Sequence, residues 1–150
     1  MKFNALVPEL SVSNISESKK FYLEFLGFHL EYERFDDKFA FLSLGESQIM
    51  LEEINGSWDT GVLKFPLGRG INFQIDIDDV EKLAAALKRH GIKLFREMME
   101  NHYESDNEVF VKKEILVQDP DGYLLRFSQS MNPSRAVLKN KGDWHVRNEK

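Results

Sequence analysis

The stretch that decides the fold is Asp119-Pro120-Asp121-Gly122-Tyr123-Leu124-Leu125-Arg126-Phe127. Its first four residues predict a tight turn, because proline fixes φ, glycine accepts a positive φ, and aspartate side chains can bond nearby backbone amides. The runs on either side, 110–118 and 123–129, predict the two strands of a hairpin. Alternation in the second strand places Leu124, Arg126 and Ser128 on one face, and Tyr123, Leu125 and Phe127 on the other. The interpretation of function therefore depends on whether Arg126 faces a cavity or open solvent.

Composition restricts the class of protein. The chain has 150 residues, 42% of them hydrophobic, with twelve Phe, which is enough for the core of one domain over residues 1–130. No apolar run approaches the roughly 20 residues that span a bilayer, and residues 1–4 do not begin a signal peptide, so we expect a cytoplasmic protein without membrane contact. The absence of cysteine excludes disulfides and thiolate metal sites. The net charge of −5 disfavours nucleic acid; it fits either a cationic ligand or ordinary solubility.

The first half of the chain predicts a strand, a helix and three strands. A helix follows the first strand, with Asn14 and Glu17 as a capping box and Gly27 as its stop. The apolar stripe of this helix contains Phe21, Tyr22, Phe25 and Leu26. The predicted strands are 6–13, 28–35, 39–44 and 48–54.

The second half repeats this pattern. The caps Asn14 and Asp78 are 64 residues apart, and so are the stops Gly27 and Gly91. The predicted strands are 70–77, 92–98, 109–118 and 123–129, with residues 100–108 as a polar connection. The sequence thus predicts an α+β fold of two βαβββ modules, about 4–54 and 70–130, linked by 55–69. Residues 131–150 predict a basic tail, in which Trp144 is the residue that could dock on the body or on a second subunit.

The doubled βαβββ order resembles the vicinal oxygen chelate superfamily of glyoxalases, extradiol dioxygenases and bleomycin-resistance proteins. The residues that carry this resemblance are 18–22, 26–28 and the turn 119–123. Within the superfamily, residues 7–10, 68–72 and Glu114 look most like the bleomycin-resistance branch. The resemblance implies mixed sheets that curl into cups whose concave faces hold a metal or a ligand.

The positions that hold metal ligands in such relatives carry poor donors here. By resemblance they fall at Val7, Asn72, Arg126 and either Glu52 or Glu53. Valine cannot coordinate a metal, arginine has no usable lone pair, and a transition metal needs about three good ligands. The four histidines, at 29, 90, 102 and 145, form no ligand spacing. We therefore expect no metal, no cofactor and no catalytic residue.

The aromatic residues suggest a ligand. Phe39 and Phe41 lie two apart on one strand, Trp58 is in the loop between the halves, and Tyr103 and Phe110 flank the acidic connection. These rings could form core, but beside carboxylates they would also suit a planar cationic molecule. The candidate ligand-binding residues are Phe39, Phe41, Glu52, Glu53, Trp58, Asn72, Tyr103, Phe110 and Arg126.

The functional hypothesis is a metal-free homodimer that sequesters a bleomycin-type antibiotic, or another cationic aromatic molecule, in a dimer cleft. Bleomycin-resistance relatives carry a tryptophan at the position that aligns with Val111, and this chain departs from them there. Arg126 would either pair with Glu52 or Glu53 or bind an anionic group on the ligand. The alternative is a divergent metal-dependent lyase, isomerase or dioxygenase that uses Glu53 with Gln74 or Glu9. A third possibility is a protein–protein interaction module.

Overall fold

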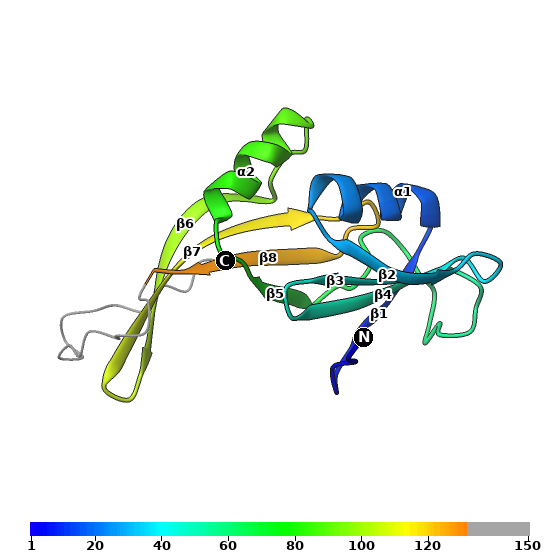
Figure 1. Ribbon diagram of the computed structural model, residues 1–150, viewed down its shortest axis with the longest axis horizontal. Helices are drawn as coiled ribbons and strands as arrows, with labels where there is room; N and C mark the ends of the chain where they lie inside the picture. The colour runs from blue at the N-terminus through cyan, green and yellow to red at the C-terminus, as the bar shows by residue number, and fades with distance from the viewer. Residues whose placement is uncertain (132–150) are drawn as a thin grey trace. The chain divides into compact units, whose positions relative to one another are not determined.

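The computed structural model describes residues 1–131, and the tail expectation, with Trp144, lies outside the described residues. The first half contains β1 (Glu9–Val12), α1 (Ile15–Lys20), the π-helical turn η1 (Phe21–Phe25), β2 (His29–Arg34), β3 (Phe39–Leu44) and β4 (Ser47–Glu53). The second half contains β5 (Asn72–Asp76), α2 (Val80–Arg89), β6 (Arg96–Ser105), β7 (Glu108–Gln118) and β8 (Leu124–Ser130). The two predicted βαβββ modules are therefore confirmed (Figure 1).

Each module forms its own four-stranded sheet. The strand orders are β1-β4-β3-β2 and β5-β8-β7-β6. In the first sheet β1 runs parallel to β4, whereas β2–β3 and β3–β4 are antiparallel, so the sheet is mixed. The first strand of each module pairs with its last strand, because the helix carries the chain across the sheet between them.

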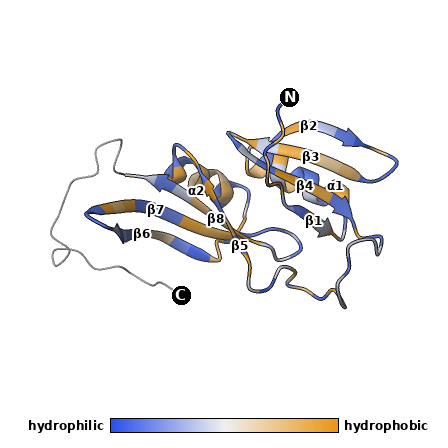
Figure 2. Ribbon diagram, turned by 90° about the horizontal axis from the view of Figure 1, so that it is seen from below, coloured by the Kyte–Doolittle hydropathy of each residue, from blue (hydrophilic) through white to orange (hydrophobic). Residues whose placement is uncertain are grey.

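One helix covers one face of each sheet (Figure 1). In the first sheet, Leu10, Val12, Leu51 and the α1–η1 residues Phe21 and Tyr22 are all buried at 5% exposure or less. Hydrophobic residues follow much of β3, which is orange in Figure 2. In the second sheet, the core residues are Ile75, Val80, Leu87, Val109, Ile115, Val117, Leu125 and Phe127. These apolar faces leave the opposite face of each sheet for polar and aromatic groups.

The helix caps follow the sequence closely, with one correction. Asn14 caps α1 by accepting a hydrogen bond from the Glu17 amide, as predicted. The cap of α2 is Asp79, whose carboxylate accepts from the Lys82 amide, so the prediction of Asp78 was wrong by one residue. Two adjacent aspartates have the same capping chemistry, and only the extended backbone of Asp79 (φ −147°) selects between them.

The second half differs from its prediction in β6. The predicted strand 92–98 begins only at Arg96. The stretch 100–108 was expected to be a connection, but β6 runs to Ser105 and pairs with β7 up to a turn that contains Asp106. The sequence did not predict this extent because the side chains of β6 are mostly polar. Much of β6 is only half-buried, so its sequence lacks the apolar content of a core strand. Among the described residues, no helix has the length and apolar character needed to cross a membrane.

The chain forms two compact units whose boundaries do not follow the halves. The first unit is Met1–Asn72 with Gln118–Leu124, and the second is Phe73–Val117 with the chain from Leu125. Hydrogen bonds join the turn 118–124 to other segments of the first unit. The Asp121 carboxylate accepts from the Ser13 amide, the Tyr123 hydroxyl donates to the Ser11 carbonyl, and the Leu67 amide donates to the Asp121 carbonyl. The aspartates also bond their own turn, as predicted, because Asp119 accepts from the Asp121 and Tyr123 amides.

Gly122 makes this turn possible, and its replacement tests the packing there. Gly122→Ala is expected to lower the free energy of unfolding by about 2 kcal/mol, because an alanine at its φ of +95° is strained. The added Cβ would also lie 2.5 Å from the Pro66 Cβ and 2.6 Å from the Pro66 Cα. Gly45→Ala is the control, since its φ is +58° and no heavy atom lies within 4 Å. Urea unfolding that gave equal losses in both variants would show that the Pro66 contact is unimportant.

Candidate functional site

The first sheet gathers aromatic and acidic side chains on the face away from α1. Cross-strand partners point to the same face of a sheet, and here Phe39 lies opposite Arg34 and Glu52, while Phe41 lies opposite Tyr32 and Met50. Glu9 lies opposite Met50 and joins the same face. We call this surface the first-sheet face, defined by Glu9, Tyr32, Arg34, Phe39, Phe41 and Glu52.

The register separates the two adjacent glutamates that the sequence could not distinguish. Glu52 lies on the first-sheet face, where its Oε1 accepts a hydrogen bond from the Trp58 indole N–H at 3.1 Å. Glu53 points to the helix side: its Oε2 accepts from the Ile15 amide at 3.2 Å, and this hydrogen bond lowers the pKa of Glu53. Glu53 therefore holds the start of α1, and Glu52 is the carboxylate available to a site.

Electrostatics couple the charged groups of the first-sheet face. Burial raises the pKa of Glu9, and the neighbouring Glu52 carboxylate raises it further, because two like charges resist joint ionisation. The Arg34 guanidinium acts in the opposite direction on Glu9. The Cζ atom of Arg34 lies 3.9 Å from the centroid of the Phe39 ring, which is a cation–π contact. The face thus combines two carboxylates, one cation and stacked rings.

The aromatic rings form one cluster. Tyr32 stacks on Phe41 with centroids 5.4 Å apart and an interplanar angle of 14°, and it tilts against Phe39 at 5.9 Å. Phe3 meets Phe41 edge-on at 5.3 Å. Phe39 and Phe41 are only 3% and 2% exposed, whereas Trp58 is 64% exposed. Of the three aromatic candidates in this half, Trp58 alone presents an open ring surface.

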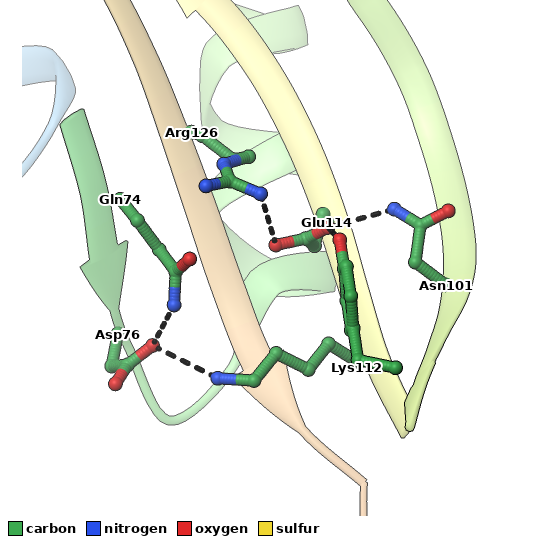
Figure 3. A network of polar contacts seen from close by, with 7 residues as sticks. Gln74, Asp76, Asn101, Lys112, Glu114 and Arg126 are labelled. Carbon is green, nitrogen blue, oxygen red and sulfur yellow. Dashed lines mark hydrogen bonds and ion pairs between the residues drawn. The ribbon is translucent and has the colours of Figure 1, made fainter. Parts of the chain in front are cut away.

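The second sheet gathers a polar network on the face away from α2 (Figure 3). We call this surface the second-sheet face, and its residues are Gln74, Asp76, Asn101, Tyr103, Lys112, Glu114 and Arg126. Its centre is Glu114, which is 0% exposed. Glu114 Oε1 accepts hydrogen bonds from Tyr103 Oη at 2.6 Å and from Asn101 Nδ2 at 2.7 Å, and Oε2 lies 3.6 Å from Arg126 Nη1. A buried carboxylate is held here by two neutral donors and one cation.

Arg126 and Tyr103 are both tied to this carboxylate. The Arg126 side chain is 28% exposed, so its guanidinium lies between the buried Glu114 and solvent. The expected ion-pair partners of Arg126 were Glu52 and Glu53, and Glu114 was not among them. Burial raises the pKa of Tyr103, the Glu114 carboxylate raises it further, and the Arg126 charge opposes that shift. Lys112 Nζ lies 3.6 Å from Asp76 Oδ1 in the same network (Figure 3).

The remaining candidates occupy separate places. Tyr103 and Phe110 are directly opposite each other on β6 and β7, so the structure brings this pair together. Val111 lies opposite His102, on the other face from Phe110, as alternation predicts. Asn72 is exposed at the start of β5. Sequence reasoning did not select Arg34, Asn101 or Glu114 as site residues. Glu114 directly precedes the apolar run 115–117, but two lysines precede it, so its burial was not evident from the sequence.

The donors at the metal positions implied by the superfamily do not fit a catalytic metal. Val7 has no donor atom, Asn72 offers a weak amide oxygen, and Arg126 is a cation paired with Glu114. Of these positions, Glu52 alone places a carboxylate on the first-sheet face. Within residues 1–131, no three His, Asp or Glu side chains are close enough together to hold a metal ion.

The fold consists of two α+β modules, each with a four-stranded sheet that carries a helix on one face. A family model described as the Glyoxalase/Bleomycin resistance protein/Dioxygenase superfamily matches residues 3–127. The chain belongs to this superfamily, as its sequence resemblance predicted.

Three solved structures are similar to this chain. A superfamily member from Vibrio splendidus is 35% identical over 82% of this chain and 95% of that chain, with a TM-score of 0.39. A glyoxalase/bleomycin resistance protein/dioxygenase from Alicyclobacillus acidocaldarius is 21% identical over 85% and 92%, with a TM-score of 0.60. TioX from Micromonospora is 15% identical over 86% and 100%, with a TM-score of 0.66. These last two support the fold alone. The search of curated proteins finds no match.

Proposed function

We propose that this chain is a metal-free binding protein that holds a cationic aromatic molecule against the first-sheet face. The observation that carries the proposal is the shared face of Glu9 and Glu52 with Phe39 and Phe41. A planar cation gains from both partners at once, because rings stack on its aromatic part and carboxylates attract its charge. Trp58, bonded to Glu52 and largely exposed, adds a further ring at the edge of this surface.

The second-sheet face supports binding rather than metal chemistry. Arg126 stands where the superfamily resemblance implies a glutamate ligand, and its charge is compensated by the buried Glu114. An arginine at that position offers no lone pair to a metal. Of the two roles expected for Arg126, the contact with Glu114 favours the structural one.

Sequestration of a bleomycin-type antibiotic by a cytoplasmic homodimer is the specific form of this proposal. Its support is the superfamily assignment together with the acidic and aromatic character of the first-sheet face. Light scattering during size-exclusion chromatography measures the assembly directly. A monomer at micromolar concentration would contradict the dimer, while the first-sheet face could still bind a ligand.

Thermal unfolding with and without ligand tests the proposal. Bleomycin, or a cationic dye such as proflavine, is expected to stabilise the protein by about 2.7 kcal/mol when present at 100 times its dissociation constant. Glu52→Gln should weaken the stabilisation, because it removes the charge that attracts the ligand. Glu46→Gln, an exposed glutamate at a hairpin turn, is the matched control and should leave it unchanged.

Two results would overturn the proposal. The first is an absence of stabilisation by every aromatic cation tried. The second is a stoichiometric transition metal in protein prepared without chelator, measured by mass spectrometry of the elements, with activity lost on its removal. That result would favour the alternative, a metal-dependent enzyme of the glyoxalase or dioxygenase type.

A further inference from the structure

The two buried rings of the first-sheet face are covered by groups from the chain itself. The Arg34 guanidinium lies 3.9 Å from the Phe39 centroid. The Phe3 ring stands edge-on to Phe41 at 5.3 Å and to Tyr32 at 6.5 Å, both at 85°. We call Phe3 and Arg34 the cover residues. Because Phe39 and Phe41 are almost fully buried, a ligand can reach their rings only if the cover residues move.

The cover residues are held by weak, solvent-exposed interactions. Phe3 is itself 58% exposed. Its segment is fixed by three exposed hydrogen bonds, from the Asn4 amide to Gln48 Oε1, from Asn4 Nδ2 to the Glu46 carbonyl, and from Gln48 Nε2 to the Lys2 carbonyl. Water competes for such bonds, so each adds little net stability.

Arg34 is held no more firmly. Its ion pair with Asp37 joins side chains that are 49% and 60% exposed, and exposed pairs of this kind contribute little. Moving both cover residues therefore disturbs much less structure than moving any buried side chain.

The cover residues supply the chemistry that a cationic aromatic ligand would supply. Phe3 contributes an aromatic ring, and Arg34 contributes a planar cation close enough to Glu9 to oppose the rise that burial and Glu52 cause in the pKa of that carboxyl. We propose that Phe3 and Arg34 occupy a binding site for aromatic amidines and guanidines, which displace them by placing a ring on Phe41 and a planar cation over Phe39. This inference rests on the proposed function and names its ligand class.

Internal competition of this kind lowers the apparent affinity. When the open state is a minor fraction of the protein, the apparent dissociation constant rises by the inverse of that fraction. Removing a cover residue enlarges the fraction and tightens binding without adding a contact to the ligand. This behaviour is opposite to that of an ordinary contact residue, whose removal weakens binding.

Calorimetric titration with pentamidine, an aromatic diamidine, tests the inference. Phe3→Ser and Arg34→Gln are each expected to lower the dissociation constant by about threefold or more, and the double variant should lower it further. Phe35→Ser is the control for Phe3, because this Phe is 83% exposed. Asp37→Asn is the control for Arg34, because it removes the ion pair but keeps the guanidinium. Both controls should keep a dissociation constant within about twofold of that of the parent protein.

Benzamidine should bind and its neutral analogue benzamide should not, since only the former carries a planar cation.

The outcomes separate the two proposals. Pentamidine binding that is unchanged or weakened in Phe3→Ser and Arg34→Gln would overturn this inference and leave the proposed function standing. Failure of every variant to bind pentamidine, benzamidine and bleomycin would overturn both. Binding that becomes measurable only in the double variant would support the inference most directly.

Discussion

Replacing Glu114 with alanine is expected to lower the free energy of unfolding by about 2 to 3 kcal/mol, the upper part of the range for leaving a buried hydrogen-bond partner unsatisfied. The carboxylate is 0% exposed and serves three partners at once. Its loss leaves the Arg126 charge without this anion and the Tyr103 and Asn101 donors without an acceptor. The cost is largest for Asn101, which is 3% exposed, whereas Arg126 still reaches solvent.

Urea unfolding measures this loss of stability, and two further variants serve as comparisons. Glu108→Ala, at the exposed start of the same strand, should change stability by less than about 0.5 kcal/mol. Arg126→Ala should destabilise the fold while leaving ligand affinity unchanged, if Arg126 is structural. Reduced affinity with unchanged stability would instead assign Arg126 to ligand recognition, and a small effect of Glu114→Ala would show that the network is not essential to the fold.

The second large effect is a pH dependence carried by Asp119. Burial raises the pKa of this carboxyl from 3.8 to about 6, although hydrogen bonds from Tyr22 and from the Tyr123 and Asp121 amides oppose the shift. The folded state therefore binds this proton more tightly than the unfolded state. Its stabilising contribution is complete below about pH 4 and is lost as the pH rises through 6. The loss at neutral pH amounts to about 3 kcal/mol.

Asp119→Asn isolates this contribution, because every other carboxyl titrates in both proteins. Its side-chain oxygen can still accept from the two turn amides, while its amide faces the Tyr22 hydroxyl. The stability of the variant relative to the parent should rise by about 2 to 3 kcal/mol between pH 4 and pH 7. Urea unfolding at several pH values provides the measurement. Parallel stability curves for the two proteins would show that Asp119 does not titrate in this range.

The fold was predictable because its signals are local. Asn14 with Glu17 begins one helix, Gly27 and Gly91 end the two, and the turn at 119–122 requires its own residue types. Each of these features depends on neighbours in sequence, so the doubled βαβββ order could be read from the chain. The two errors, at Asp78 and in the extent of β6, arose where local chemistry was ambiguous or where half-burial removed the apolar pattern.

The candidate site was predictable only in part, because its contacts depend on register. Residues 52 and 53 are both glutamates, and a shift of one position exchanges the first-sheet face for the helix face. Only pairing with β1 and β3 assigns Glu52 to the first-sheet face. The cover by Phe3 was beyond prediction, since it joins residues 38 apart in sequence through side-chain packing alone. Glu114 was hidden for a different reason, because it follows two lysines and the three charges together resemble an exposed segment.

The grouping of residues 118–124 with the first unit has a consequence for how the chain is made on the ribosome. Synthesis proceeds from the N-terminus, and domains generally fold as units once their residues have emerged. The first unit lacks its last segment until Leu124 has been added, by which time the whole of Phe73–Val117 has also been synthesised. Neither unit can therefore reach its final state early in translation, and the nascent protein must keep its apolar faces from aggregating until almost the entire described chain is available.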